Sequence, residues 1–395
     1  MTTQIGHMEK KDTLHYIQII NDVFAILYVV VVFCMKDTIS SSEPIALFLF
    51  MMPTILRSYL EGRSIRLIVL WATAFYGYCL ISILWTIAPS TYFTALIKML
   101  LMFITTSLYM TSMREVDVIL KGFIVGGIIL SLRLLIETPY EQLITHRLGS
   151  SIGINENIVG LLFSYASSIC LYYIKKTKAY LVLYLLFTLM ALLSGSRKAF
   201  ALILIVVFCY YINSIKKISN VLYIIPFGIL FFLVIELTMN NPILYNIIGR
   251  RVMGLLNMFT GEGKVDTSTL ARMDLIQIGI ELFKEKMWVG YGFNSFIHLN
   301  KYKLIAHNNY IELLVCHGII GTVLYYLMPI SILIQLIRIW LAKTREVVIA
   351  ILFIDMILVG DYGTVSYHVS TSLVLMCVSY SFVVFYGDNS NKKIR

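Results

Sequence analysis

The sequence predicts an all-α polytopic membrane protein of about 12 transmembrane helices with a long extracytoplasmic loop containing amphipathic helices. Of its 395 residues, 59% are hydrophobic and only 14% are charged, whereas soluble domains carry about 25% charged residues. No stretch sustains the alternation of a β-strand, and backbone groups in lipid must be satisfied within the chain, which favours helices. We therefore expect a single transmembrane domain over residues 1–395.

The candidate spans are apolar stretches near the length that a bilayer requires, which is about 20 residues with a range of roughly 17–25. They lie at 17–35, 44–60, 65–87, 91–111, 117–136, 157–174, 180–195, 198–214, 220–239, 309–337, 346–361 and 365–386. The second, seventh, eighth and eleventh are short. The tenth is expected to be an apolar helix that runs from Ile311 past Gly318 towards Trp340.

A long loop, 240–308, is predicted between the ninth and tenth spans. Within it, 244–259 and 270–287 place apolar residues at helical spacing among charged ones. Such amphipathic stretches predict two interfacial helices over the mouth of the bundle.

Orientation follows from the cations, because cytoplasmic loops of membrane proteins are rich in Lys and Arg. Every second loop is basic. These cations are Lys10, Lys11, Arg57, Arg63, Arg66, Arg114, Lys121, Lys175, Lys176, Lys178, Lys216, Lys217, Arg338, Lys343, Arg345, Lys392, Lys393 and Arg395. Both termini should therefore be cytoplasmic and the loop 240–308 extracytoplasmic. The net charge of +10 indicates contact with anionic lipid and no nucleic-acid partner.

Several cations fall on the extracytoplasmic side, against this rule. They are Arg133, Arg147, Arg197, Lys198, Arg250, Arg251 and Arg272. Arginine binds phosphate through a planar fork of donors, so these residues suggest a diphosphate held at headgroup depth. The alternative is that they snorkel to lipid phosphates without further function. Arg197 is the strongest candidate, because it lies in the Gly-Ser-Arg turn of LLSGSRKAF between two spans.

A second candidate feature is the cluster AHNNY at 306–310, at the mouth of an apolar helix. His307 could act as a general base towards a hydroxyl, since the imidazole titrates near neutral pH. The alternative is a structural histidine, which is the reading we prefer for His317. Three acids near the outer halves of their spans are weaker candidates: Glu236, Asp355 and Asp361.

Four stretches resemble successive motifs of the O-antigen polymerase and ligase superfamily, which includes Wzy-type polymerases of polysaccharide repeat units. They are HRLGSSIGINENIVGLLF at 146–163, LLSGSRKAFALI at 192–203, ARMDLIQIGIELFKEKMWVGYGFNSF at 271–296 and AHNNYIELLVCHGIIGTVLYY at 306–326. Their order and intervals match the family across 146–326.

The resemblance implies an inverting glycosyl transfer. A sugar hydroxyl attacks the anomeric carbon of a glycan linked to polyprenyl diphosphate, and the diphosphate leaves. Arg197 and Arg272 correspond to arginines that grip the diphosphate, and His307 to a histidine that orients or deprotonates the acceptor. The further candidates for substrate binding are Arg147, Arg250, Arg251, Asn155, Asn157, Asn308 and Tyr310.

This interpretation requires no metal and no cofactor, and the sequence carries neither a nucleotide-binding motif nor cysteines at metal-ligand spacing. The expected partners are a polyprenyl diphosphate-linked oligosaccharide, the lipid bilayer and a chain-length regulator protein. The expected location is the cytoplasmic membrane of a bacterium, with the active site on its extracytoplasmic face. One alternative is a ligase that transfers glycan to another acceptor. Another is a lipid-linked oligosaccharide flippase, which would place its binding residues near the midplane at the interface of internal repeats.

Overall fold

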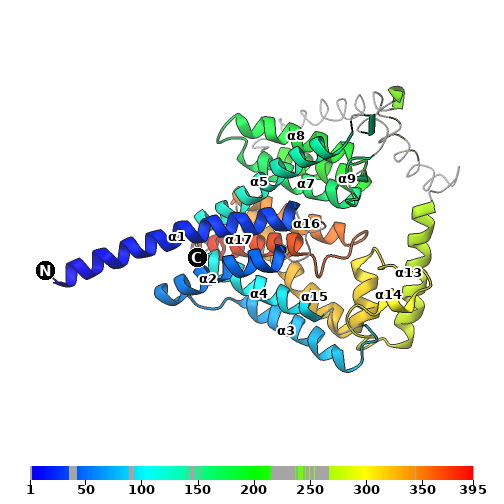
Figure 1. The fold of residues 1–395 in the computed structure, drawn as a ribbon, viewed down its shortest axis with the longest axis horizontal. Coiled ribbons are helices and arrows are strands. Elements are labelled where there is room, and N and C mark those ends of the chain that lie inside the picture. The colour runs from blue at the N-terminus through cyan, green and yellow to red at the C-terminus, as the bar shows by residue number, and fades with distance from the viewer. Residues whose placement is uncertain are drawn as a thin grey trace. The chain divides into compact units, whose positions relative to one another are not determined.

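The computed structural model describes residues 2–34, 42–88, 93–139, 141–142, 147–150, 153–214, 267–342 and 344–394, with isolated residues between 215 and 266. Within these ranges every regular element is a helix (Figure 1). The chain divides into two compact units. The first unit comprises Met1–Gly122 with Ala271–Arg395, and the second comprises Phe123–Leu270. Helix α5 (Met113–Glu137) runs from the first unit into the second.

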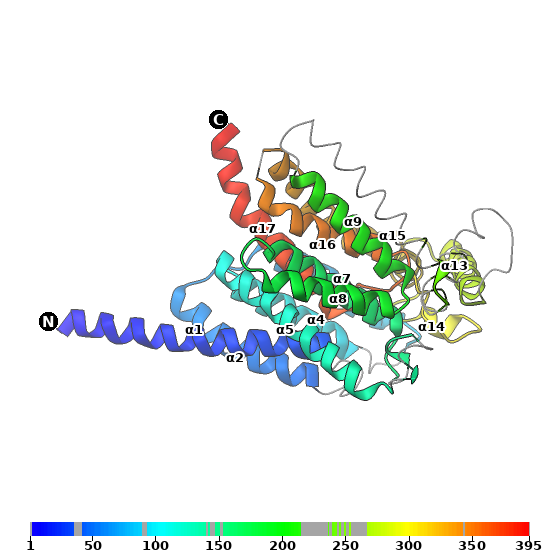
Figure 2. The ribbon, with the colours of Figure 1, turned by 90° about the horizontal axis from the view of Figure 1, so that it is seen from above.

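The first unit is a bundle built around the C-terminal helix. Its elements are α1 (Thr2–Cys34), α2 (Ser42–Glu61), α3 (Leu67–Ile81), η1 (Ser82–Leu84), α4 (Phe93–Tyr109), the start of α5, most of α13 (Thr267–Glu285), α14 (Phe296–Leu299), α15 (Asn309–Leu341), η6 (Arg345–Val347), α16 (Val348–Gly360) and α17 (Ser370–Ile394). Helix α17 packs against α1, α4, α15 and α16 (Figure 1, Figure 2). Its residues from Leu373 to Val378 are at most 1% exposed, which places the core of the unit there.

The second unit contains the rest of α5 with α7 (Glu156–Tyr173), α8 (Ala179–Leu193) and α9 (Arg197–Ser214). Helix α7 packs against both α8 and α9. Close approach is possible because α7 presents small residues to its neighbours. A side chain at Gly160 would clash with Ser194, Ser196 and Ala199.

The predicted membrane character is confirmed in its coarse form. Five described helices are long and apolar enough to cross a membrane, at Asp12–Cys34, Leu67–Leu84, Met113–Glu137, Asn309–Leu341 and Ser370–Gly387. Shorter apolar helices lie at Phe93–Tyr109, Ala179–Leu193 and Lys198–Asn213. The chain is therefore a multi-pass membrane protein. Each predicted span other than 220–239, which lies outside the described residues, coincides with a helix, and the total of twelve spans stays a prediction.

Loops of the first unit meet at the two ends of its helices. At one end, the guanidinium of Arg63, just after α2, donates to the carbonyl of Tyr109 at the end of α4 (3.1 Å). At the other end, the N–H of Asn309, at the start of α15, donates to the carbonyl of Asp361 after α16 (2.7 Å). The first end carries the loops predicted to be cytoplasmic, and the second carries those predicted to be extracytoplasmic.

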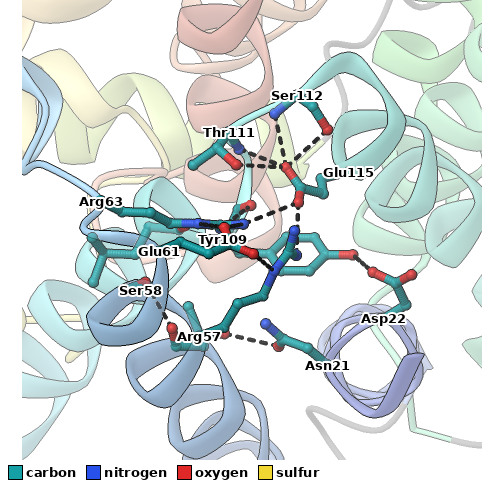
Figure 3. A network of polar contacts seen from close by, with 12 residues as sticks. Asn21, Asp22, Arg57, Ser58, Glu61, Arg63, Tyr109, Thr111, Ser112 and Glu115 are labelled. Carbon is teal, nitrogen blue, oxygen red and sulfur yellow. Dashed lines mark hydrogen bonds and ion pairs between the residues drawn. The ribbon is translucent and has the colours of Figure 1, made fainter. Parts of the chain in front are cut away.

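A buried charge network closes the first of these ends (Figure 3). Its centre is Glu115 in the first turn of α5, which is 1% exposed. One carboxylate oxygen accepts the N–H groups of Thr111 and Ser112 (2.8 and 2.7 Å) and their hydroxyls. The other oxygen meets Arg57 (2.7 Å) and Arg63 (3.3 Å). Glu115 thus caps α5 as in a capping box while neutralising two cations.

Two further acids complete this network. Glu61 pairs with Arg57 (2.8 Å) and Arg63 (2.6 Å), and Asp22 accepts the hydroxyl of Tyr109 (2.7 Å). Because its residues come from α1, α2, the α2–α3 loop, α4 and α5, the network joins five segments at one point.

Candidate active site

Helix α15 is discontinuous, which differs from the continuous apolar helix that the sequence predicts. Gly318 has φ 63° and ψ −166°, values that no helix adopts. The break separates a short half-helix, 309–317, from a longer one, 319–341. Breaking a helix leaves N–H and C=O groups without intrahelical partners, and in a membrane protein such groups must find other partners within the chain.

The segment Met287–Gly292 supplies those partners. The N–H groups of Tyr291 and Gly292 donate to the carbonyls of Val315 and Cys316 (2.9 and 2.8 Å). On the other side of the break, the carbonyls of Met287 and Trp288 accept the N–H groups of Ile319 and Ile320. The Tyr78 hydroxyl of α3 donates to the carbonyl of His317 (2.9 Å). These five hydrogen bonds hold the break in one geometry.

Glycine is required where the two segments touch. A Cβ atom at Gly318 would lie 2.2 Å from the Trp288 carbonyl oxygen, and one at Gly290 would lie 2.5 Å from that of Val315. Both glycines also have positive φ angles, which glycine adopts without steric cost. Gly290 of WVGYG and Gly318 of HGIIG therefore belong to one structural feature, although 28 positions separate them.

His317, beside the break, is completely buried. Its ring lies against Phe75, Phe293 and Tyr367, with centroid separations of 6.1, 6.2 and 5.6 Å. The Sγ atom of Cys79 lies 3.6 Å from Nε2. An aromatic cage of this kind agrees with a packing role for His317.

His307 lies just outside the first turn of the short half-helix. Asn308 is the N-cap, and its side chain accepts the N–H of Ile311 (3.2 Å). From within the helix, the buried carboxyl of Glu312 reaches back to the N–H of Ala306 (2.8 Å). Between these two fixed points His307 is half-buried and has φ 51°. A non-glycine residue in this left-handed region is strained, and such strain is concentrated at functional sites.

Asn309 fixes this end of the helix through side-chain hydrogen bonds, and we call the resulting cluster the Asn309 brace. Asn309 is fully buried, and its side-chain N–H groups donate to the Tyr326 hydroxyl and the Asp361 carboxylate, both at 3.0 Å. Its side-chain oxygen accepts the N–H groups of Ser366 and Tyr367. All the hydrogen-bonding capacity of the amide is thereby used, and the start of α15 is locked to the loop between α16 and α17.

Tyr310 completes this brace, since its hydroxyl donates to the Leu358 carbonyl (2.9 Å) and its ring stacks on Tyr326 at 4.9 Å. Asn308 and Tyr310, which the sequence predicts as substrate-binding residues, therefore both hold the backbone around His307. Asn309 and Tyr326 were not among the predicted site residues. The pair of asparagines was the only signal for Asn309, and no spacing links it to position 326.

Helix α13 brings Arg272 to the same end of α15. Asp274, two residues on, accepts the hydroxyl of Tyr302 (2.7 Å), and Leu275 shares a buried cluster with Ala306. Arg272 lies one turn before Leu275 and is half-buried. The residues that follow Arg272 are thus packed against those that precede His307.

The turn after α13 is also fixed in place. The hydroxyl of Tyr291 donates to Glu285, and Lys286 lies over the Tyr291 ring at 4.5 Å. Burial, together with this hydrogen bond, raises the pKa of Tyr291 to about 12, so its hydroxyl stays a donor at physiological pH. Side-chain contacts of Tyr291 with Glu285 and Lys286 therefore hold the turn that connects α13 to the break in α15.

The second unit assembles the other predicted residues. Arg147 donates to the Ser194 carbonyl (2.8 Å), to Glu156 (3.1 Å) and to the side-chain oxygen of Asn157 (3.0 Å). Asn155 is the N-cap of α7. Arg147 thus links the start of α7, at Glu156 and Asn157, to Ser194 at the end of α8.

Arg197 is the first residue of α9, directly after that turn. Arg250 and Arg251 lie outside the described residues. The structure therefore gathers the predicted residues into two sets. His307, Asn308, Tyr310 and Arg272 belong to the first unit, whereas Arg147, Asn155, Asn157 and Arg197 belong to the second.

The first set can perform polar chemistry. It presents a strained, half-buried imidazole at a helix N-terminus, with an arginine on the adjacent helix. Partial positive charge at a helix N-terminus and a guanidinium both favour an anion, and the imidazole can accept a proton.

Comparison with known proteins supports the resemblance seen in the sequence. Residues 181–326 match the family model Wzy_C, described as O-antigen ligase, which confirms the predicted superfamily. This range runs from α8 to the middle of α15 and contains Arg197, Arg272, His307 and the helix break. No curated protein matches the chain.

Proposed function

We propose that the protein is a glycosyltransferase that joins polyprenyl diphosphate-linked oligosaccharide repeat units at the extracytoplasmic face of the cytoplasmic membrane. The observation that carries the proposal is the geometry of His307. It is half-buried with φ 51°, its neighbours Ala306 and Asn308 are both hydrogen-bonded to α15, and Ala306 shares a buried cluster with Leu275 of the helix that carries Arg272. The family match over the same segment supports a glycosyl transfer of the O-antigen ligase or polymerase type.

In the proposed reaction, an acceptor hydroxyl forms a bond to the anomeric carbon of the donor glycan. The bond from that carbon to the diphosphate oxygen breaks, and its electron pair leaves with the diphosphate. Inversion at the anomeric carbon is expected from a single displacement. His307 accepts or orients the hydroxyl proton, and Arg272 stabilises the charge on the leaving group. The corresponding role of Arg197, which the resemblance implies, stays a prediction.

The broken helix is the feature that would favour a flippase, because transporters bind substrate at unwound helices. Here, however, the backbone groups that flank the break are already used. The carbonyls of Val315, Cys316 and His317 and the N–H groups of Ile319 and Ile320 all have partners within the chain. These groups are therefore not available to bind a transported substrate. The break thus has a structural role, which favours an enzyme over a flippase.

The test uses the purified protein in liposomes with a polyprenyl diphosphate-linked repeat unit as donor. We expect Arg272→Ala to abolish transfer and Arg272→Lys to restore little of it, because an ammonium lacks the planar fork. Lys284→Ala is the matched control, since it removes an exposed cation from the same helix and should have no effect. Full activity of Arg272→Ala would refute the role of Arg272.

The same assay separates a polymerase from a ligase. A polymerase makes longer glycans from the lipid-linked donor alone, since a second donor molecule serves as acceptor. A ligase needs a separate acceptor and yields one transfer to each. We expect a ladder of products without any added acceptor.

A further inference from the structure

Helix α15 is too long for one membrane span. Its 33 residues correspond to roughly 50 Å, against a hydrocarbon core of about 30 Å. The longer half-helix, from 319 to 341, spans roughly 34 Å at the helical rise of 1.5 Å per residue. That length alone crosses the core with some tilt. The break at Gly318 therefore divides α15 near the point where a full span would begin.

The exposed side chains of α15 place the membrane boundary at the same point. Its exposed large apolar residues recur at helical spacing, as a lipid-facing stripe requires. They are Ile320, Val323, Leu327, Ile330, Ile334, Ile337 and Leu341. All lie after the break. Between 309 and 317 no large apolar side chain is exposed, so the lipid-facing surface begins at Ile320.

Met287, Trp288 and Val289 lie level with the beginning of this stripe. Their exposed fractions are 44%, 67% and 41%, although their backbone is buried in the break. The carbonyls of Met287 and Trp288 accept the N–H groups of Ile319 and Ile320 at 2.8 and 3.2 Å, which fixes the depth of the three side chains.

The chemistry of this exposed group is that of a membrane interface. Tryptophan is enriched where the hydrocarbon meets the headgroups, because its ring is apolar and its N–H is polar. Lys284 and Lys286, both exposed, lie next to the three apolar residues and could reach lipid phosphates. An apolar wedge flanked by cations fits an anionic lipid surface better than it fits water.

We propose that Met287–Val289 insert into the lipid–water interface of the extracytoplasmic leaflet and hold the break of α15 at the membrane surface. The half-helix 309–317 then rises through the headgroup layer, with His307 at its far end, roughly 15 Å from the break at 1.5 Å per residue. This proposal requires α15 to span the membrane and is independent of the proposed glycosyl transfer.

The test is fluorescence quenching of the full-length protein in vesicles of phosphatidylcholine and phosphatidylglycerol. Part of the phosphatidylcholine carries bromine on its acyl chains, either near the headgroup or near the chain end. We expect lipid brominated near the headgroup to quench Trp288 most. Trp288→Phe should remove this component of the quenching while the protein keeps its monodisperse elution in detergent.

Trp340→Phe is the comparison variant, because Trp340 lies near the opposite end of the same half-helix. It should remove a second component that is also quenched by the shallow bromine. The proposal would be overturned if quenching were the same in wild type and Trp288→Phe. It would also be overturned if Trp288 were quenched only by aqueous iodide, which would place it in water. Protection from both quenchers would indicate that protein covers it, against the proposal.

Discussion

Two buried polar clusters at opposite ends of the first unit differ in how they use charge. Around Glu115, two arginines and two acids neutralise one another, and the carboxylate also takes four donors of the adjacent turn. Around Asn309, the carboxylate of Asp361 accepts hydrogen bonds from two neutral donors, the Asn309 amide and the Tyr326 hydroxyl. Beside it lies the strained, half-buried His307.

This difference distinguishes a structural cluster from a candidate active site. In the Glu115 network the acids and arginines pair with one another, so the network can hold helix ends together but has few groups available to bind a ligand. The Asn309 brace uses amides and hydroxyls to fix the backbone next to His307, a half-buried titratable residue at the start of α15. Rigid support beneath a positioned side chain is what catalysis requires.

The largest effect on folding is expected from Glu115→Ala. Removing Glu115 leaves two buried arginines with one acid, the more exposed Glu61, and takes away the cap of α5. Loss of one partner from a buried ion pair costs about 3–5 kcal/mol. We expect little protein in the membrane and a much lower Tm for what remains. Glu61→Ala is the control, because Glu61 is more exposed and Glu115 still neutralises both arginines. A wild-type Tm for Glu115→Ala would show that the network is not a structural joint.

A smaller loss of stability, but a complete loss of activity, is expected from Asn309→Ala. The Tyr326 hydroxyl still donates to Asp361 in this variant, so the N–H groups of Ser366 and Tyr367 are the main partners left unsatisfied. Each costs about 1–3 kcal/mol, part of which water can recover near the outer end. Thermal unfolding and the transfer assay should therefore diverge. Tyr326→Phe removes only one hydroxyl from the brace and should fall between the variant and wild type. An Asn309→Ala protein with full transfer activity would separate the brace from the site.

The smallest effect is expected from His317→Ala. Its ring fills space among Phe75, Phe293 and Tyr367, so its removal should cost roughly 1–3 kcal/mol, as core substitutions commonly do. Transfer activity per folded molecule should stay near wild type. If activity fell while Tm did not, His317 would belong to the chemistry after all.

Much of this organisation could be predicted from the sequence, because helical spans are set by local composition. Apolar length, the alternation of basic loops and the amphipathic pattern of 270–287 all depend on neighbouring residues, and α13 forms where that pattern occurs. The cluster at 306–310 could also be singled out, since polar residues at the start of an apolar helix are unusual.

The break in α15 could not be read from its own sequence. Gly318 lies in an apolar stretch, where a single glycine is tolerated within a helix. Its backbone lies against Trp288 and Val289 of another segment, and nothing local in the sequence indicates that these two segments touch. Likewise Arg147 looks like a free cation in the sequence, whereas its partners Glu156 and Ser194 become evident only once α7 and α8 pack together.

The most direct test of the central claim compares His307→Gln with Lys303→Gln in the reconstituted transfer assay. Both residues lie in the same loop with positive φ angles, 51° and 53°, so the backbone cost is matched. If His307 takes the acceptor proton, its loss should reduce the rate about 10²–10⁴-fold, with single lipid-linked units accumulating, whereas Lys303→Gln should remain active. Transfer by His307→Gln at the wild-type rate would contradict the claim that His307 is the base of this reaction.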